Sequence, residues 1–442
     1  MVGGLFLLIV LCQDFPAHAS SNSQSKEQVS TADNLPELRL SLQDAMQAAV
    51  ETNPSVQLSR EQIQAAQSIA STRLGALLPS LSGNASYANR RFFLGSFAGR
   101  GGQSDPLDFY NLRAFLSQNL FSLSLIQQWR ASRAGVEVSS LDSEVIKRDT
   151  MATVALGYLG ALRSKEAVKA RQANVTLNGK LLRLARERKA AGVATRLDVT
   201  RAAVQFKTEK QRLLVAENAA ARSKLNLLRA MGLPYDIHLI LIDRLDLVKI
   251  PKQNLKEALQ VAKARRVELQ AQQRRERLAR LNLSSIRAER VPSLVGTGDV
   301  GLLGNQIPDA VNTHNVQVLM TIPIFDGGQR EGRISESRSL VRQESIRTRD
   351  MQAQVALEVR DALMTLDSTA EQITVAQQGL QLSLKELNLA KERFSVGVVT
   401  NIEVTNAQNS LAAARDTLIE ALFNFHVARV NLARAQGRLE EL

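Results

Sequence analysis

Charged residues occupy matching positions in two short stretches of this chain. Residues 188–202 read RKAAGVATRLDVTRA and residues 393–407 read RFSVGVVTNIEVTNA, which align without a gap at an offset of 205 (393 − 188). Asp198 then corresponds to Glu403. Each glycine stands where a helix could end in the left-handed conformation, and the Thr and carboxylate that follow could cap and charge the next helix. The pattern predicts the same helical hairpin twice.

No pattern of catalytic or metal-binding residues accompanies these turns. The sequence contains no P-loop, no nucleophile elbow and no ligand pair at metal-binding spacing. His18, His238, His314 and His426 are scattered, and the only cysteine is Cys12, near the N-terminus. We therefore expect no enzyme, no catalytic residue, no metal and no cofactor.

The composition is typical of long helices packed against one another. Aromatic residues make up only 4% of the 442 residues, and the formal charge is +13. That charge would also suit a basic nucleic-acid-binding coiled coil, which predicts a cytoplasmic chain with an uncleaved N-terminus. Because Arg and Glu alternate along helical faces without a purely basic block, we expect no nucleic acid partner.

The N-terminal residues have the pattern of a secretory signal. Residues 1–19 hold an apolar run from Gly3 to Leu11 and end in Ala-His-Ala, which matches a cleavage site, although no Lys or Arg follows Met1. A lipid on Cys12 is an alternative, although a small residue should precede such a cysteine. Residues 20–40 are expected to form a flexible segment.

The remainder divides into two repeats, 41–235 and 254–439, joined by a link at 236–253. The sequence Pro-Ser-Leu occurs at 79–81 and again at 292–294, an offset of 213 (292 − 79). This second pair of landmarks supports a duplication.

Each repeat contains a pattern expected for a β-hairpin after its Pro-Ser-Leu. Residues 80–91 are weak strand candidates, whereas residues 110–121 alternate, with Leu112 and Leu116 on one face. Residues 315–325 alternate more cleanly. Because isolated hairpins leave unpaired edges, several chains could close a membrane-spanning barrel, or the strands could form a soluble cap.

Long stretches without proline predict very long helices. No proline occurs between residues 125 and 190 or between residues 324 and 442. A helix of about 65 residues would be about 100 Å long. Apolar residues three and four apart predict a coiled-coil seam. In the second repeat they are Val359, Ala362, Leu366, Ile373, Ala376, Leu380, Leu387 and Phe394, followed by Leu411, Ala414, Leu418, Ala421, Phe425, Ala428, Leu432 and Ala435.

Together these motifs resemble the TolC-like outer-membrane efflux proteins. The resemblance runs from about Leu40 to Leu439 and includes the segments IPIFDGG at 322–328 and LARAQG at 432–437. It implies a mainly α fold with a β portion, in which two tandem repeats each contain a β-hairpin and long coiled-coil helices. Three identical chains would form a twelve-stranded outer-membrane β-barrel continued by a periplasmic α-helical barrel.

The resemblance also implies a function and partners. The homotrimer would be the exit duct of a tripartite efflux pump or a type I secretion system. Its partners would be a periplasmic adaptor protein, an inner-membrane RND, ABC or similar transporter, and outer-membrane lipid. The alternative is a soluble periplasmic coiled-coil tether that forms no pore.

The duplicated turns would be the periplasmic tip of such a duct. By resemblance, adaptor docking falls on Arg188, Gly192, Val193, Thr195, Arg393, Gly397, Val398 and Thr400. The tunnel-mouth gate falls on Asp198, Glu403, Phe394 and Val399, where three copies of the two carboxylates would favour cations. Helix termination and ordinary helix N-terminal charge remain the alternative explanations for these residues.

The gate departs from the best-known member of the family. There, an acidic residue at the position of Asp198 is held by an Arg and a Tyr from the other repeat, and ungapped alignment places Val399 and Phe394 at those positions. Neither side chain can form a salt bridge or donate a hydrogen bond. A closed state must therefore be stabilised by other contacts.

Overall fold

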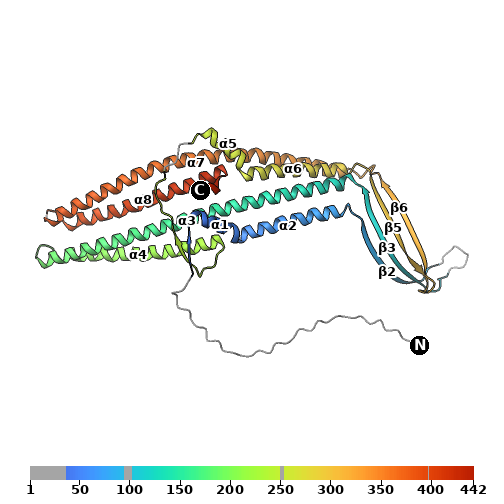
Figure 1. Ribbon diagram of the computed structural model, residues 1–442, viewed down its shortest axis with the longest axis horizontal. Coiled ribbons are helices and arrows are strands. Elements are labelled where there is room, and N and C mark those ends of the chain that lie inside the picture. The colour runs from blue at the N-terminus through green and yellow to red at the C-terminus, as the bar shows by residue number, and fades with distance from the viewer. Residues whose placement is uncertain (1–35, 94–101, 249–252, 397) are drawn as a thin grey trace, which may run out of the picture.

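The computed structural model describes residues 36–93, 102–248, 253–396 and 398–442. The proposed signal segment, Cys12 and Gly397 lie outside these residues. The molecule is elongated, with four strands at one end and the turns of two long helical hairpins at the other (Figure 1). Among the described residues, no helix has the length and apolar character needed to cross a membrane.

Both repeats have the same order of elements. The first contains α1 (Leu42–Thr52), α2 (Pro54–Gly75), the strands β2 (Ser80–Arg90) and β3 (Leu107–Phe121), then α3 (Leu123–Ala190) and α4 (Arg196–Met231). The second contains α5 (Leu255–Arg265), α6 (Val267–Ala288), β5 (Ser293–Gly304), β6 (Val311–Thr321), α7 (Gln329–Ser395), α8 (Asn401–Gln436) and a short 3₁₀ helix, Leu439–Glu441. The duplication predicted from the sequence therefore corresponds to two similar structural units.

Local sequence explains where the shorter helices begin and end. Ser41 caps α1 in a capping box with Asp44, and Asn53 caps α2 while Pro54 occupies its first turn. Gly232 ends α4 at φ +77°, and a Cβ there would lie 2.6 Å from the carbonyl oxygen of Thr52. This position therefore requires glycine both for its backbone conformation and for the close approach of the α1–α2 junction.

The predicted hairpins pair with each other to form one antiparallel sheet in the order β2-β3-β5-β6. Within the part of the chain that the structure describes, β2 and β6 are its edges. The predicted strand 315–325 instead covers residues 311–321, because the ladder ends before Pro323, which has no N–H to donate.

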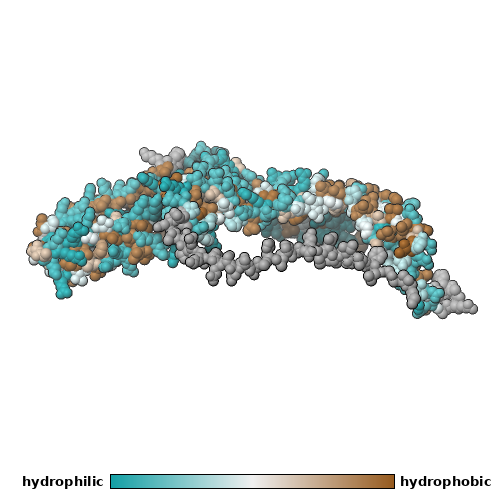
Figure 2. Space-filling model, turned by 60° about the horizontal axis from the view of Figure 1, so that its bottom comes forward, coloured by the Kyte–Doolittle hydropathy of each residue, from teal (hydrophilic) through white to brown (hydrophobic). Residues whose placement is uncertain are grey.

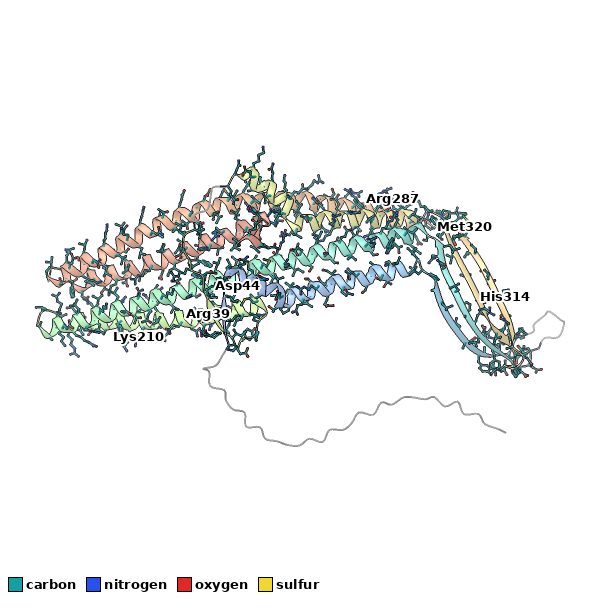
Figure 3. All side chains as sticks on the ribbon, viewed as in Figure 1. Arg39, Asp44, Lys210, Arg287, His314 and Met320 are labelled. Atoms are coloured by element: carbon teal, nitrogen blue, oxygen red, sulfur yellow. The ribbon has the colours of Figure 1, made fainter. Side chains whose placement is uncertain are left out.

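The two faces of this sheet differ in polarity. Strand register places most of the exposed apolar residues on one face, which we call the apolar face: Leu81, Tyr87, Leu112, Leu116, Leu120, Val300, Leu302, Val316, Val318 and Met320. Four exposed apolar residues lie on the other face: Leu107, Leu303, Val311 and Leu319. The opposite face, the polar face, carries Ser82, Asn84, Ser86, Asn111, Arg113, Thr297, Asp299, Thr313, Asn315 and Gln317. Figure 2 shows hydrophobic residues gathered where the strands leave the helices, and Figure 3 shows His314 and Met320 at different heights along β6.

A second, two-stranded sheet joins the start of the first repeat to the link. Strand β1 (Glu37–Leu40) pairs in parallel with β4 (His238–Leu241). The fully buried Tyr158 of α3 donates its hydroxyl proton within this region, with its oxygen 2.8 Å from Asp243 Oδ2 and 3.0 Å from the carbonyl of Leu40. The prediction that residues 20–40 are flexible was therefore wrong for residues 37–40, because the link supplies a strand partner and Tyr158 holds it in place.

The long helices pack through the predicted seam. Helix α3 has 68 residues and α7 has 67, close to the predicted length. In the hairpin of α7 and α8, Val359, Ile373, Leu411 and Phe425 are at most 2% exposed. Helix α3 contacts both α4 and α8, and α8 contacts α7, so α4 and α7 lie on the outside of the four-helix layer.

Candidate functional site

The turn between α3 and α4 is a tight, fully capped connection. The amide of Val193 donates to the carbonyl of Arg188 at 3.0 Å, and Gly192 adopts φ +76°. Thr195 and Asp198 form a capping box, in which the hydroxyl of Thr195 donates to Asp198 Oδ2 at 2.7 Å. Hydrogen bonds from the Thr195 side chain and backbone lower the pKa of Asp198, so this carboxylate stays ionised as a helix cap.

The turn between α7 and α8 repeats the closing backbone hydrogen bond but has different side-chain contacts. The amide of Val398 donates to the carbonyl of Arg393 at 3.1 Å. Thr400 is the N-cap residue of α8, but its side chain makes no capping bond. Arg393 instead lies 3.4 Å from Glu403 in an exposed ion pair. Glu403 is thus paired with an arginine of its own turn, whereas Asp198 is engaged by Thr195.

Side chains also connect one turn to the other. The guanidinium carbon of Arg188 lies 4.4 Å from the ring centroid of Phe394, and the same group donates a hydrogen bond to the Phe394 carbonyl. In the opposite direction, Asn401 Nδ2 donates to the carbonyl of Asp198 at 3.2 Å. Below them, Phe394 packs with Leu387, Ala390, Val404, Ala407 and Leu411 in a buried apolar cluster.

Most of the residues predicted to dock the adaptor are exposed. Val193 and Val398 are 63% and 68% exposed, and Arg393, Thr400 and Gly192 are also exposed. These residues are accessible in the single chain, as docking requires, and Thr195 is exposed beside them, whereas Arg188 is half-buried.

The predicted gate residues behave differently from one another. Glu403 is exposed and Asp198 is half-buried, whereas Phe394 is only 7% exposed and Val399 packs partly against the apolar cluster. Sequence reasoning assigned Phe394 no polar contact, but it missed that Arg188 approaches both its ring and its carbonyl. In the sequence, an arginine two residues before the end of a helix does not indicate a contact with a residue 206 positions away.

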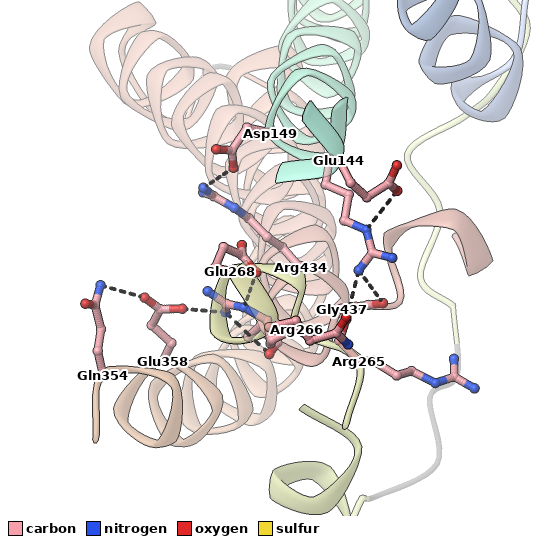
Figure 4. A network of polar contacts seen from close by, with 12 residues as sticks. Glu144, Asp149, Arg265, Arg266, Glu268, Gln354, Glu358, Arg434 and Gly437 are labelled. Carbon is pink, nitrogen blue, oxygen red and sulfur yellow. Dashed lines mark hydrogen bonds and ion pairs between the residues drawn. The ribbon is translucent and has the colours of Figure 1, made fainter. Parts of the chain in front are cut away.

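A second charged cluster lies far from the turns, where α5 and α6 meet α7 and α8 (Figure 4). Arg266 is 7% exposed and lies 3.0 Å from Glu268 and 2.6 Å from Glu358. Burial alone would lower the pKa of this guanidinium, but the two carboxylates raise it above its usual value. Since every charge in this cluster is paired, we interpret it as the polar fastening between the short and long helices.

Neither region contains the ligands of a metal site. Among the residues that the structure describes, no group of three or more His, Cys, Asp or Glu side chains converges.

Comparison with known proteins identifies similar chains. The sequence model of a family described as "Outer membrane efflux protein" matches residues 45–233 and 258–438. The pyoverdine export outer membrane protein OpmQ of Pseudomonas aeruginosa is 24% identical over 313 residues, which cover 70% of this chain and 65% of that relative. The toluene efflux pump outer membrane protein TtgC of Pseudomonas putida is 24% identical over 411 residues, which cover 90% of this chain and 82% of that protein.

Solved structures share the fold. The outer membrane protein VceC of Vibrio cholerae superposes with a TM-score of 0.78 at 16% identity, covering 90% of this chain and 96% of that one. At this identity the likeness concerns the arrangement of elements: a tandem repeat of strand pairs and long helical hairpins.

Proposed function

Because this chain belongs to the outer membrane efflux protein family, whose members are outer-membrane channels rather than enzymes, we propose that it is the exit duct of an efflux pump or a type I secretion system. In that role it catalyses no reaction. It passively conducts substrates delivered by an inner-membrane transporter and a periplasmic adaptor. The observation that carries this proposal is the four-stranded sheet with one apolar and one polar face.

The sheet has the polarity that a membrane channel needs. In transmembrane barrels, apolar residues face lipid while polar residues alternate with them and face the interior. Here Leu112, Leu116 and Val316 are exposed on one face, and Asn111, Arg113 and Gln317 lie on the other. A soluble cap would leave this apolar face in water, which disfavours the tether alternative.

The edges of the sheet support closure by identical copies. An antiparallel sheet with an even number of strands has edge strands that run in opposite directions. Strand β6 of one copy can therefore pair antiparallel with β2 of the next, and closure removes both edges. Three copies give twelve strands, within the range of known transmembrane barrels.

The helical edges support the same assembly. Helix α7 presents exposed apolar residues at intervals of 7, 11, 7 and 7: Leu357, Met364, Val375, Leu382 and Leu389. Helix α4 presents Val204, Leu214 and Val215, each more than 60% exposed.

Charge on the two edge helices is complementary. Helix α4 carries eight Lys or Arg residues, including the outward Lys210 of Figure 3, and three Asp or Glu residues. Residues 351–395 of α7 carry four Lys or Arg residues and six Asp or Glu residues. The next copy's α4 therefore fits against α7 both by its apolar residues and by its charge.

The two helical turns form the periplasmic end of the duct. Exposed Val193 and Val398 supply apolar contact area for the adaptor. The docking surface also includes Arg188, Gly192, Thr195, Arg393 and Thr400 of the same two turns, and Gly397, which lies outside the described residues. The gate is built from Asp198, Glu403, Phe394 and Val399, and Arg188 holds the two turns together through Phe394. In the best-known family member, an Arg and a Tyr at the positions of Val399 and Phe394 hold the closed state. Here the contact between Arg188 and Phe394 takes that role.

Reconstitution of the full chain tests the proposal. We expect the protein to require detergent for extraction, to have the mass of three chains by native mass spectrometry and to conduct ions in planar lipid bilayers. Leu112→Arg should abolish membrane assembly, because a lipid-facing Arg costs about 2–4 kcal/mol in each copy. Asn111→Arg, one residue away on the polar face, is the matched control and should still assemble. A monomer that stays soluble and forms no pore would instead support the tether.

A further inference from the structure

One side chain connects three strands of the sheet on its polar face. Arg113 of β3 forms an ion pair with Asp299 of β5, and its Nη2 donates to Thr313 Oγ1 of β6 at 2.7 Å. Its Nε donates to Asn111 Oδ1 at 3.4 Å. The guanidinium thus crosses β5 completely, which an ordinary cross-strand pair does not do.

A glycine makes this crossing possible. In the strand register Gly301 lies directly between Arg113 and Thr313. A Cβ at Gly301 would lie 2.3 Å from the carbonyl oxygen of Leu112 and 2.7 Å from the Cα of Arg113. Any side chain here would therefore collide with β3 and occupy the path of the guanidinium. Glycine at position 301 therefore allows Arg113 to reach Thr313.

The pair lies on the face that would line the duct. Arg113 and Asp299 are on the polar face, and their side chains are only 16% and 12% exposed in the single chain. Each holds its counter-charge in direct contact, so the field of the pair in the lumen is that of a dipole rather than of a charge. Three copies would place three such dipoles around the strand section.

We propose that the Arg113–Asp299 pair determines the ion selectivity of the strand section by keeping its charges cancelled, so that anionic and cationic cargo pass alike. This inference rests on the proposed function, because it requires the polar face to line a conducting pore. It assigns a selectivity-determining role to a place far from the helical turns, at the opposite end of the molecule (Figure 1). Removal of either partner would leave three like charges on the lumen wall.

Reversal potentials in a KCl gradient across planar bilayers test this role. Arg113→Gln leaves Asp299 unpaired and should shift the reversal potential toward cation selectivity. Asp299→Asn leaves Arg113 unpaired and should shift it toward anions, and the double variant should return to the parent value. The shifts should be larger near 10 mM salt than near 1 M, because the Debye length falls from about 30 Å to about 3 Å.

Two controls separate charge from structure. Thr313→Val removes the bond to β6 without changing any charge, and should leave the selectivity unchanged. Thr313→Cys modified with a cationic or an anionic thiol reagent should shift the selectivity in the direction of the added charge. This second measurement uses a channel whose Arg113–Asp299 pair is intact, so it remains informative if either charge variant fails to assemble.

The outcomes distinguish this inference from the proposed function. Conducting channels whose reversal potentials are unchanged in both single variants and after modification at position 313 would overturn the selectivity role while leaving the duct intact. Absence of conductance in the parent chain would instead contradict the duct itself.

Discussion

The guanidinium of Arg188, at the end of α3, lies over the ring of Phe394, at the end of α7, with 4.4 Å between its carbon and the ring centroid. The same side chain donates to the Phe394 carbonyl. The corresponding residue of the second repeat, Arg393, pairs with Glu403 of its own turn instead. One of two duplicated arginines therefore joins the turns, and the other remains local.

Arg188→Ala should loosen the helical turns. It removes a cation–π contact worth about 0.5–2 kcal/mol and a hydrogen bond to a carbonyl. We expect higher single-channel conductance or more frequent opening in planar bilayers. Arg183→Ala, which removes an exposed arginine from the same helix, is the matched control. Equal conductance in the two variants would show that Arg188 does not restrict the opening.

Glu403→Gln should reduce the cation preference of the channel. Up to six carboxylates from Asp198 and Glu403 of three copies would attract cations at the tunnel mouth. Because Glu403→Gln also leaves the guanidinium of Arg393 without its counter-charge, the loss should be at least as large as for Asp198→Asn. Reversal potentials in a KCl gradient measure both variants. An unchanged cation-to-anion ratio in Glu403→Gln would remove that residue from the gate.

Gly232→Ala should destabilise the junction between α1, α2 and α4. The new Cβ would meet the carbonyl oxygen of Thr52 at 2.6 Å, and φ is +77°, so we expect a loss of about 2 kcal/mol or more. Guanidinium unfolding followed by circular dichroism in detergent measures this loss. Gly160→Ala, in the interior of α3 with no atom within 4 Å of its added Cβ, should be neutral or slightly stabilising. Similar midpoints for the two variants would contradict the packing argument.

Acid should weaken the folded chain partly through His426. This residue is 8% exposed, its Nε2 lies 2.9 Å from the carbonyl of Asp246, and burial together with nearby Arg429 lowers its pKa. The unfolded imidazole binds a proton near pH 6.5 whereas the folded one does not. Stability is therefore complete above pH 6.5 and falls as the pH drops below it, until the folded pKa is reached.

His426→Gln keeps a donor toward Asp246 but does not titrate. Its free energy of unfolding, measured between pH 7.5 and 5, should depend less on pH than that of the parent chain. Parallel pH profiles for the two proteins would exclude His426 as a source of the acid sensitivity.

The sequence by itself determined the repeated elements. The two copies of the turn, the absence of proline from the long helices, the alternation in 110–121 and the three-and-four spacing after Val359 are local signals, because secondary structure repeats its side-chain direction every 2 or 3.6 residues. They predicted the hairpins, the lengths of α3 and α7 and the buried seam.

Only the tertiary structure decided which elements meet across the repeats. Pairing of β3 with β5, the crossing of Arg113 to Thr313 and the contact of Arg188 with Phe394 join residues about 200 positions apart. The strand at 37–40 likewise depended on a partner in the link. Such contacts have no period along the chain, since they arise when separate elements pack, and a single sequence therefore does not indicate them.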